Sequence, residues 1–129
     1  MTCTNPRRNS GFTLIELLVV LAIVSTLLLL VTPRYFQRVD VAQEAVLRDN
    51  LRTLRQVLDG FHGDHGRFPE SLQELVDQRY LRALPVDPIT GSSDTWSLLP
   101  APEGLKGAVY DLRSGASGTA RDGTAYADW

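Results

Sequence analysis

The fold depends on one stretch, Gly11-Phe-Thr-Leu-Ile-Glu-Leu-Leu-Val-Val-Leu-Ala-Ile-Val-Ser-Thr-Leu-Leu-Leu-Leu-Val-Thr-Pro33. Its twenty-one residues from Phe12 to Thr32 include a single charged one, Glu16. A helix of that length is about 31 Å long, which is enough to cross the hydrocarbon core of a bilayer. We therefore predict a membrane-spanning helix at this place in the chain.

Glu16 is the exception in this apolar stretch. A carboxylate costs about 2.5–3.5 kcal/mol at the centre of a membrane helix on insertion scales, so it marks a functional position by default. The simpler alternative is that Glu16, so near the start of the span, only reaches back to the cytoplasmic headgroups.

Composition excludes several classes of function. The formal net charge is −2 and no basic run is interleaved with aromatic residues, so no nucleic-acid partner is expected. Cys3 is the single cysteine, which rules out an intramolecular disulfide and supports no zinc site or thiol nucleophile. His62 and His65 flank a Gly-Asp pair and are interpreted as a solvated turn rather than a metal pair. No constellation for catalysis is present, and we expect no enzyme.

The flanks of the apolar stretch set its expected orientation. Arg7 and Arg8 precede it, which places the N-terminus in the cytoplasm and the C-terminal part on the other side of the membrane. A secretory signal would have a shorter apolar core and a small-residue cleavage site. A buried core helix is disfavoured by the length and the density of leucine and valine. A plain single-pass anchor stays open, but it explains neither Gly11 nor Glu16.

The junction Gly11-Phe12-Thr13-Leu14-Ile15-Glu16 resembles the leader junction of type IV pilins and type II secretion pseudopilins. In that family a prepilin peptidase cuts after the glycine, and the new N-terminal residue is methylated. The resemblance implies cleavage between Gly11 and Phe12, N-methylation of Phe12, and an assembly role for Glu16 at the fifth mature position. Pro33 falls at the twenty-second mature position, where the family also has proline.

The resemblance also implies partners and a location. The partners are copies of this chain and other pseudopilins in a filament, a prepilin peptidase and methyltransferase, and an assembly platform in the bacterial inner membrane. The head is expected in the periplasm. The implied domains are a leader at 1–11, a transmembrane and assembly helix at 12–33, an amphipathic half-helix at 34–62, and a small head with a C-terminal loop at 63–129.

After the apolar stretch the pattern becomes amphipathic. Leu47, Leu51, Leu54, Leu58 and Phe61 recur at alternating spacings of four and three, which predicts one apolar stripe on a helix. The spacing of Glu44 and Arg48 predicts a helix-stabilising pair. We expect a single helix from Phe12 to about Phe61, ending near Gly60, with a bend at Pro33 available to it.

The remaining residues predict a small head with an α+β, type IV pilin-like fold. Ser71 and Glu74 have capping-box spacing at the start of a second, short helix. Residues 96–99 and 108–112 have strand character and predict an antiparallel hairpin or small sheet. We expect this sheet to pack on the long helix through Trp96, Leu98, Val109 and Leu112.

The C-terminal loop raises the question of a metal. Major pseudopilins carry a calcium site in the corresponding loop, and the resemblance implies that Asp111, Ser114, Asp122 and Asp128 could supply its oxygen ligands. The family's acid after the serine is not matched here, because Gly115-Ala-Ser-Gly118 contains none. The alternative is a Gly-rich surface loop whose aspartates cap turns. Calcium is thus the one candidate cofactor, and the metal-free loop stays open beside it.

We therefore predict a structural subunit of a type II secretion pseudopilus. The alternatives are a minor type IV pilin for pilus assembly, motility or DNA uptake, and a membrane-tethered binding module whose helix is only an anchor.

Overall fold

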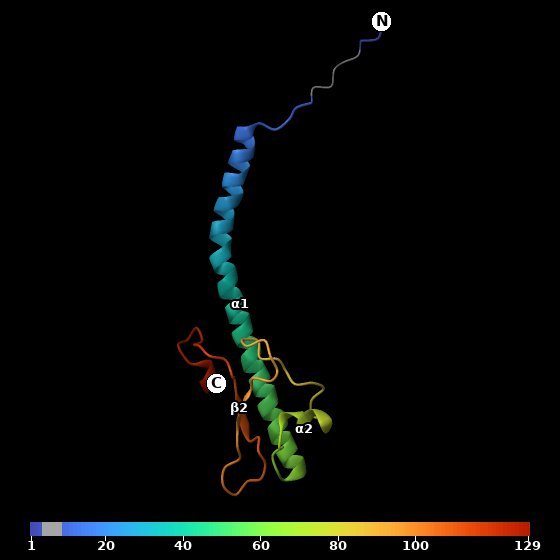
Figure 1. Ribbon diagram of the computed structural model, residues 1–129, viewed down its shortest axis with the longest axis vertical. Coiled ribbons are helices and arrows are strands. Elements are labelled where there is room, and N and C mark those ends of the chain that lie inside the picture. The colour runs from blue at the N-terminus through green and yellow to red at the C-terminus, as the bar shows by residue number, and fades with distance from the viewer. Residues whose placement is uncertain (4–8) are drawn as a thin grey trace. The chain divides into compact units, whose positions relative to one another are not determined.

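The computed structural model describes residues 1–3 and 9–129 (Figure 1). The predicted leader lies partly outside them, including Arg7 and Arg8. The chain divides into two units, Met1–Arg38 and Val39–Trp129, each of which is described here by itself.

The helix α1 runs from Leu14 to His65. The residue directly after the helix is Gly66, whose φ of +68° is left-handed and whose N–H donates to the His62 carbonyl at 2.8 Å. A glycine in this conformation is a common end of a helix. The predicted end near Gly60 was therefore wrong. Gly60 and Gly63 remain helical, since an isolated glycine costs only about 1 kcal/mol within a helix.

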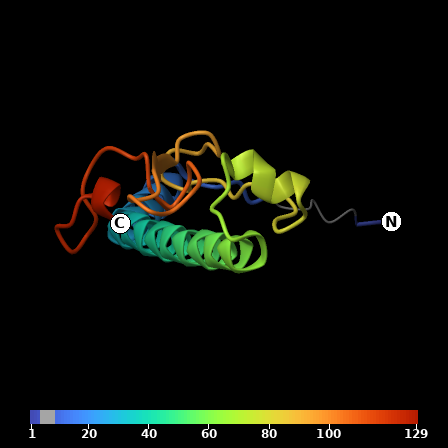
Figure 2. The same ribbon diagram turned by 90° about the horizontal axis from the view of Figure 1, so that it is seen from below.

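The core of the second unit forms on the predicted stripe of α1. All five of its residues, from Leu47 to Phe61, are almost completely buried. Figure 2, seen from below, shows the chain after His65 gathered along one side of this part of the helix. The core is completed by Leu72, Leu75, Trp96, Val109 and Leu112.

The helix α2, Leu72–Asp77, begins as its sequence predicts. The Ser71 hydroxyl accepts the N–H of Glu74 at 3.2 Å, which satisfies one of the free donors of the first turn. The Glu74 carboxylate accepts the N–H of Glu70 at 2.8 Å and binds the Arg67 guanidinium at 2.5 Å. The carboxylate thus joins the turn after α1 to the start of α2.

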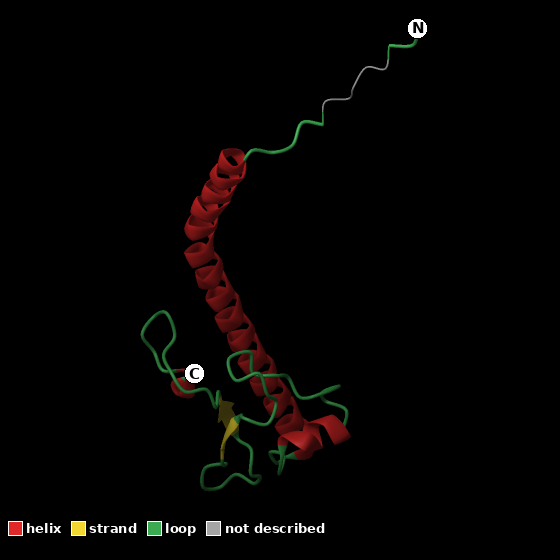
Figure 3. Cartoon of the chain, turned by 45° about the horizontal axis from the view of Figure 1, so that its top comes forward, coloured by secondary structure: helices red, strands yellow, loops and turns green. Residues whose placement is uncertain are grey.

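The sheet has two strands, β1 (Ser97–Leu99) and β2 (Asp111–Arg113), paired antiparallel with Leu98 opposite Leu112. Figure 3 shows how little of the head it occupies, since most of the chain after α2 is loop. A short 3-10 helix, η1 (Tyr126–Asp128), lies near the C-terminus. The expected α+β architecture is confirmed.

The packing of the sheet differs from the prediction at one residue. Trp96, Val109 and Leu112 are buried as expected, but Leu98 is 43% exposed. Trp96 lies outside the strand, and its indole N–H donates to the Pro85 carbonyl at 3.0 Å. The predicted packing of Leu98 on the long helix was therefore wrong, while that of the other three residues agrees with their burial.

The Arg67–Glu74 pair predicts an acid-sensitive step in the unfolding of the head. The hydrogen bond from Arg67, and then that from the Glu70 N–H, lower the pKa of Glu74. A carboxyl with a lowered pKa stabilises the fold above its unfolded pKa, about 4.3 for Glu, and this contribution is lost as pH falls through the folded value. We expect the melting temperature of the full chain in detergent to fall over this acid range, and the fall to be smaller for Glu74→Gln.

Glu103→Gln is the matched control, because Glu103 is exposed and its carboxylate has no hydrogen bond or ion pair in the described part of the chain. Its acid-induced fall should equal that of the wild type. An equally large fall in Glu74→Gln would contradict the role of the pair.

Candidate functional site

The start of α1 is capped by Thr13. Its hydroxyl accepts the N–H of Glu16 at 3.1 Å, which makes Thr13 the N-cap and Glu16 the third helical residue. Thr13 and Glu16 have the spacing of a capping box, in which the acidic side chain also supports the first turn. Our sequence analysis missed this role, although the Thr-x-x-Glu spacing signals it.

Glu16 lies in the first turn of α1 and is exposed. The aligned peptide dipoles leave partial positive charge at this end of a helix, so a carboxylate is favoured there. Ser10, Gly11, Phe12 and Glu16 line one small hollow of the surface. The predicted cleavage point and the single carboxylate of the apolar stretch therefore lie together.

Gly11 and Phe12 precede the helix in a segment without regular secondary structure. The Phe12 side chain is 88% exposed. A Cβ built on Gly11 would meet no atom within 4 Å, and the residue does not have a left-handed φ. Nothing in the fold of this unit requires a glycine at position 11, so the reason for it lies outside the described chain.

The first half of α1 makes no packed contact within its own unit. Its large apolar side chains from Leu14 to Val31 are all exposed, and its most apolar window has a mean hydropathy of 2.9 with no residue buried. The hydroxyls of Thr26 and Thr32 donate to the carbonyls four residues earlier, at 2.8 and 2.6 Å. Polar groups are thus satisfied within the helix, as an apolar environment demands.

Pro33 lies inside the helix rather than at its end. Because proline has no backbone N–H, the Leu29 carbonyl receives no hydrogen bond from position 33. This is a local weakness of the helix at the boundary that the sequence assigns to the apolar stretch.

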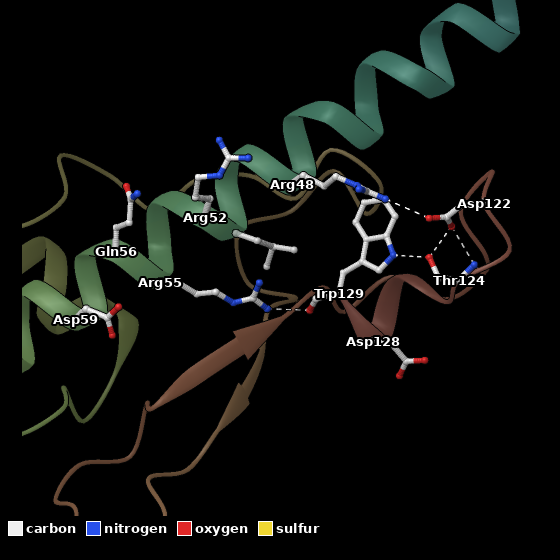
Figure 4. Close-up of a pocket in the computed structure, with 10 residues that line it drawn as sticks. Arg48, Arg52, Arg55, Gln56, Asp59, Asp122, Thr124, Asp128 and Trp129 are labelled. Carbon is white, nitrogen blue, oxygen red and sulfur yellow. Dashed lines mark hydrogen bonds and ion pairs between the residues drawn. The ribbon is translucent and has the colours of Figure 1, made fainter.

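The four predicted calcium ligands have different partners. Asp111 binds the Arg55 guanidinium at 2.9 Å. Ser114 is buried, and its hydroxyl donates to the buried carboxylate of Asp87 at 2.6 Å. Asp122 binds Arg48 at 3.2 Å, and Figure 4 shows the Asp128 side chain pointing away from it.

As they lie, these four residues do not form a coordination shell. Among residues 1–3 and 9–129, no group of three or more His, Cys, Asp and Glu side chains is suited to a metal. The calcium site stays a prediction. The side-chain oxygens of Asp111, Ser114 and Asp122 are engaged by groups of the chain itself, whereas the Asp128 carboxylate has no hydrogen bond or ion pair in the described part of the chain.

Several residues of α1 hold the C-terminal segment, and the sequence did not reveal them. The Glu44 carboxylate accepts the N–H of Arg121 at 2.9 Å and the hydroxyl of Tyr126 at 3.1 Å. The Arg48 guanidinium lies 4.2 Å from the centre of the Trp129 ring. In the described chain Glu44 and Arg48 thus contact the distant segment, and the predicted pair between them does not form.

Comparison with known proteins agrees with the N-terminal geometry. Residues 6–32 match the family model described as the prokaryotic N-terminal methylation motif. The type II secretion system core protein G of Pseudomonas aeruginosa is 34% identical over 98 residues, which cover 64% of this chain and 69% of that protein. The protein of the same name from Klebsiella michiganensis is 30% identical, with 90% and 93% covered.

A second kind of relative is the competence protein ComGC of Halalkalibacterium halodurans. It is 32% identical over 73 residues, which cover 57% of this chain and 72% of that protein. No solved structure matches the chain at a significant level.

A capped, exposed apolar helix in the same chain as a small α+β head is typical of a membrane-anchored, pilin-like structural subunit. The chain belongs to the family of type II secretion pseudopilins and related pilin-like proteins.

Proposed function

We propose that the chain is a subunit of a type II secretion pseudopilus, anchored in the bacterial inner membrane with its head in the periplasm before assembly. The observation that carries the proposal is the first half of α1, whose apolar side chains are exposed around a helix that begins with a carboxylate. Such a surface is stable only in lipid or against other helices. Copies of the same helix supply that cover in a filament.

Cleavage of the leader creates a positively charged group that can pair with the Glu16 carboxylate. A prepilin peptidase hydrolyses the Gly11–Phe12 bond and leaves a free α-amino group on Phe12. With an ordinary pKa of about 7.7–8.0, this amine is mostly cationic at neutral pH, and methylation of the nitrogen preserves its charge. The exposed segment before α1 supports the access that the peptidase requires.

Assembly then pairs unlike charges between subunits. The carboxylate of Glu16 meets the Phe12 amine of a neighbouring subunit, which fixes the axial position of one helix against the next. In an apolar environment a charge without a partner is costly, so subunits out of register are disfavoured. Pro33 gives the helix a point of local adjustment as it moves from the bilayer into the filament.

The similarity to a competence protein supports a second candidate, a pilin for DNA uptake. Residues 39–129 contain nine Lys and Arg against fourteen Asp and Glu. A surface that binds the phosphate backbone needs clustered positive charge, so the acidic head favours the secretion role over contact with DNA.

Processing can be tested by co-expression of the full chain with a prepilin peptidase. We expect a product that lacks residues 1–11 and begins at methylated Phe12, as read by mass spectrometry. Gly11→Val should block the cut without disturbing the fold, because the site has no close neighbours. Ser10→Ala should be processed normally. An uncut wild-type chain would instead support a plain anchor carrying a binding module.

Assembly can be tested by exchanging the gene in its own bacterium for variants of Glu16. Gln at this position keeps the capping box but removes the charge. We expect Glu16→Gln to insert in the membrane and be processed, yet to give neither filaments nor secretion of exoproteins. Loss of one partner of a buried ion pair costs about 3–5 kcal/mol, which is enough to prevent assembly.

Glu16→Ala separates the two roles of the side chain. If Glu16→Gln assembles and only Glu16→Ala fails, the carboxylate acts in capping and the pairing is wrong. DNA uptake is measured in the same strains. Loss of uptake with intact secretion would favour the competence role.

A further inference from the structure

The guanidinium of Arg55 is the meeting point of three oxygens from the C-terminal part of the chain. Its Nε donates to Asp111 Oδ1 at 2.9 Å. Its Nη2 donates to the backbone oxygens of Leu112 and Trp129, both at 3.0 Å. Figure 4 shows Arg55 reaching from α1 to Trp129. One side chain therefore holds both ends of the segment that leads from β2 to η1.

The three oxygens are of the kind that a calcium ion takes. One belongs to a side-chain carboxylate and two are main-chain oxygens, which are hard ligands of the kind found in calcium loops. Here they receive N–H groups from a planar guanidinium, whose positive charge is permanent at any physiological pH. A calcium ion would bring positive charge to these oxygens. Here Arg55 on α1 supplies that positive charge, together with N–H groups that donate to the oxygens.

Two more of the predicted ligands, Asp122 and Ser114, are also held by the chain. The second carboxylate of the loop, Asp122, accepts from Arg48 at 3.2 Å and from the Thr124 hydroxyl at 2.6 Å. The Ser114 hydroxyl donates to Asp87, whose other oxygen accepts the N–H of Ile89 at 2.9 Å. These groups are satisfied without an ion.

We propose that Arg55 takes the structural role of a bound calcium ion in this chain, so that the C-terminal segment 111–129 is held against α1 without a metal. Arg48 and Glu44 hold the middle of the segment, while Arg55 holds its two ends. The head then keeps its C-terminal segment in place at any calcium concentration. This inference concerns the fold of the head and stands apart from the secretion role.

Arg52 provides the matched control. It lies on the same helix, one turn before Arg55, and lines the same groove beside Trp129. In contrast with Arg55, its side chain has no hydrogen bond or ion pair in the described part of the chain, and Figure 4 shows it pointing away from Trp129. Substitution of Arg52 changes the charge of the groove without touching the three oxygens.

The test is limited trypsin digestion of the full chain in detergent, with cleavage after Arg121 followed by mass spectrometry. The wild type is compared in EDTA and in several millimolar calcium, which is above the weak end of the affinity range for extracellular calcium modules. We expect equal rates of cleavage in both. Arg55→Gln should be cut about tenfold faster at Arg121, since hydrogen bonds to a charged group are lost and the segment opens more often. Arg52→Gln should match the wild type.

Two results would overturn the proposal. The first is a wild-type segment that calcium protects and EDTA exposes, which would mean that a metal closes the loop. The second is Arg55→Gln cut no faster than Arg52→Gln. If Arg55→Gln unfolds the whole head, cleavage after Arg67 and Arg82 rises as well, and the comparison of the wild type in EDTA and calcium then decides.

Discussion

The exposed apolar surface on the first half of α1 is the feature on which the rest of the structure depends. Leucine, isoleucine and valine side chains from Leu14 to Val31 find no cover within their own unit. Burial of one such side chain is worth about 1.5–3 kcal/mol, so the helix is strongly driven into lipid or against other helices. The hydroxyls of Thr26 and Thr32 are satisfied inside the helix, which suits both environments.

The second half of the same helix supports the small head, which has few elements of its own. Only short elements follow it, α2, two strands of three residues and η1, and a two-stranded sheet has little stability alone. The stripe from Leu47 to Phe61 supplies the buried surface, while Glu44, Arg48 and Arg55 supply polar anchors for the loop-rich remainder. One helix thus carries an exposed apolar surface in its first half and the scaffold of the head in its second.

Prediction from sequence succeeded where the cause is local or periodic. The long apolar helix, the buried stripe and the Ser71 cap follow from composition, helical repeat and a three-residue spacing. It failed where the cause lies far along the chain. Nothing near Arg55 indicates Asp111 or Trp129, and Glu44 and Arg48 have an ideal local spacing but distant partners. The prediction for Leu98 was also wrong, since Leu98 lies in the three-residue strand β1 and is 43% exposed.

The central claim is that the Glu16 carboxylate forms an ion pair with a positive charge on another subunit rather than only capping its own helix. The most direct test is a structure of the assembled filament by electron cryo-microscopy, in which the Glu16 carboxylate and the nitrogen of the neighbouring subunit's Phe12 are located. Our account predicts that these groups lie within ion-pair distance, about 4 Å or less. A carboxylate that turns back to its own Thr13, with no neighbouring nitrogen within that distance, would contradict it.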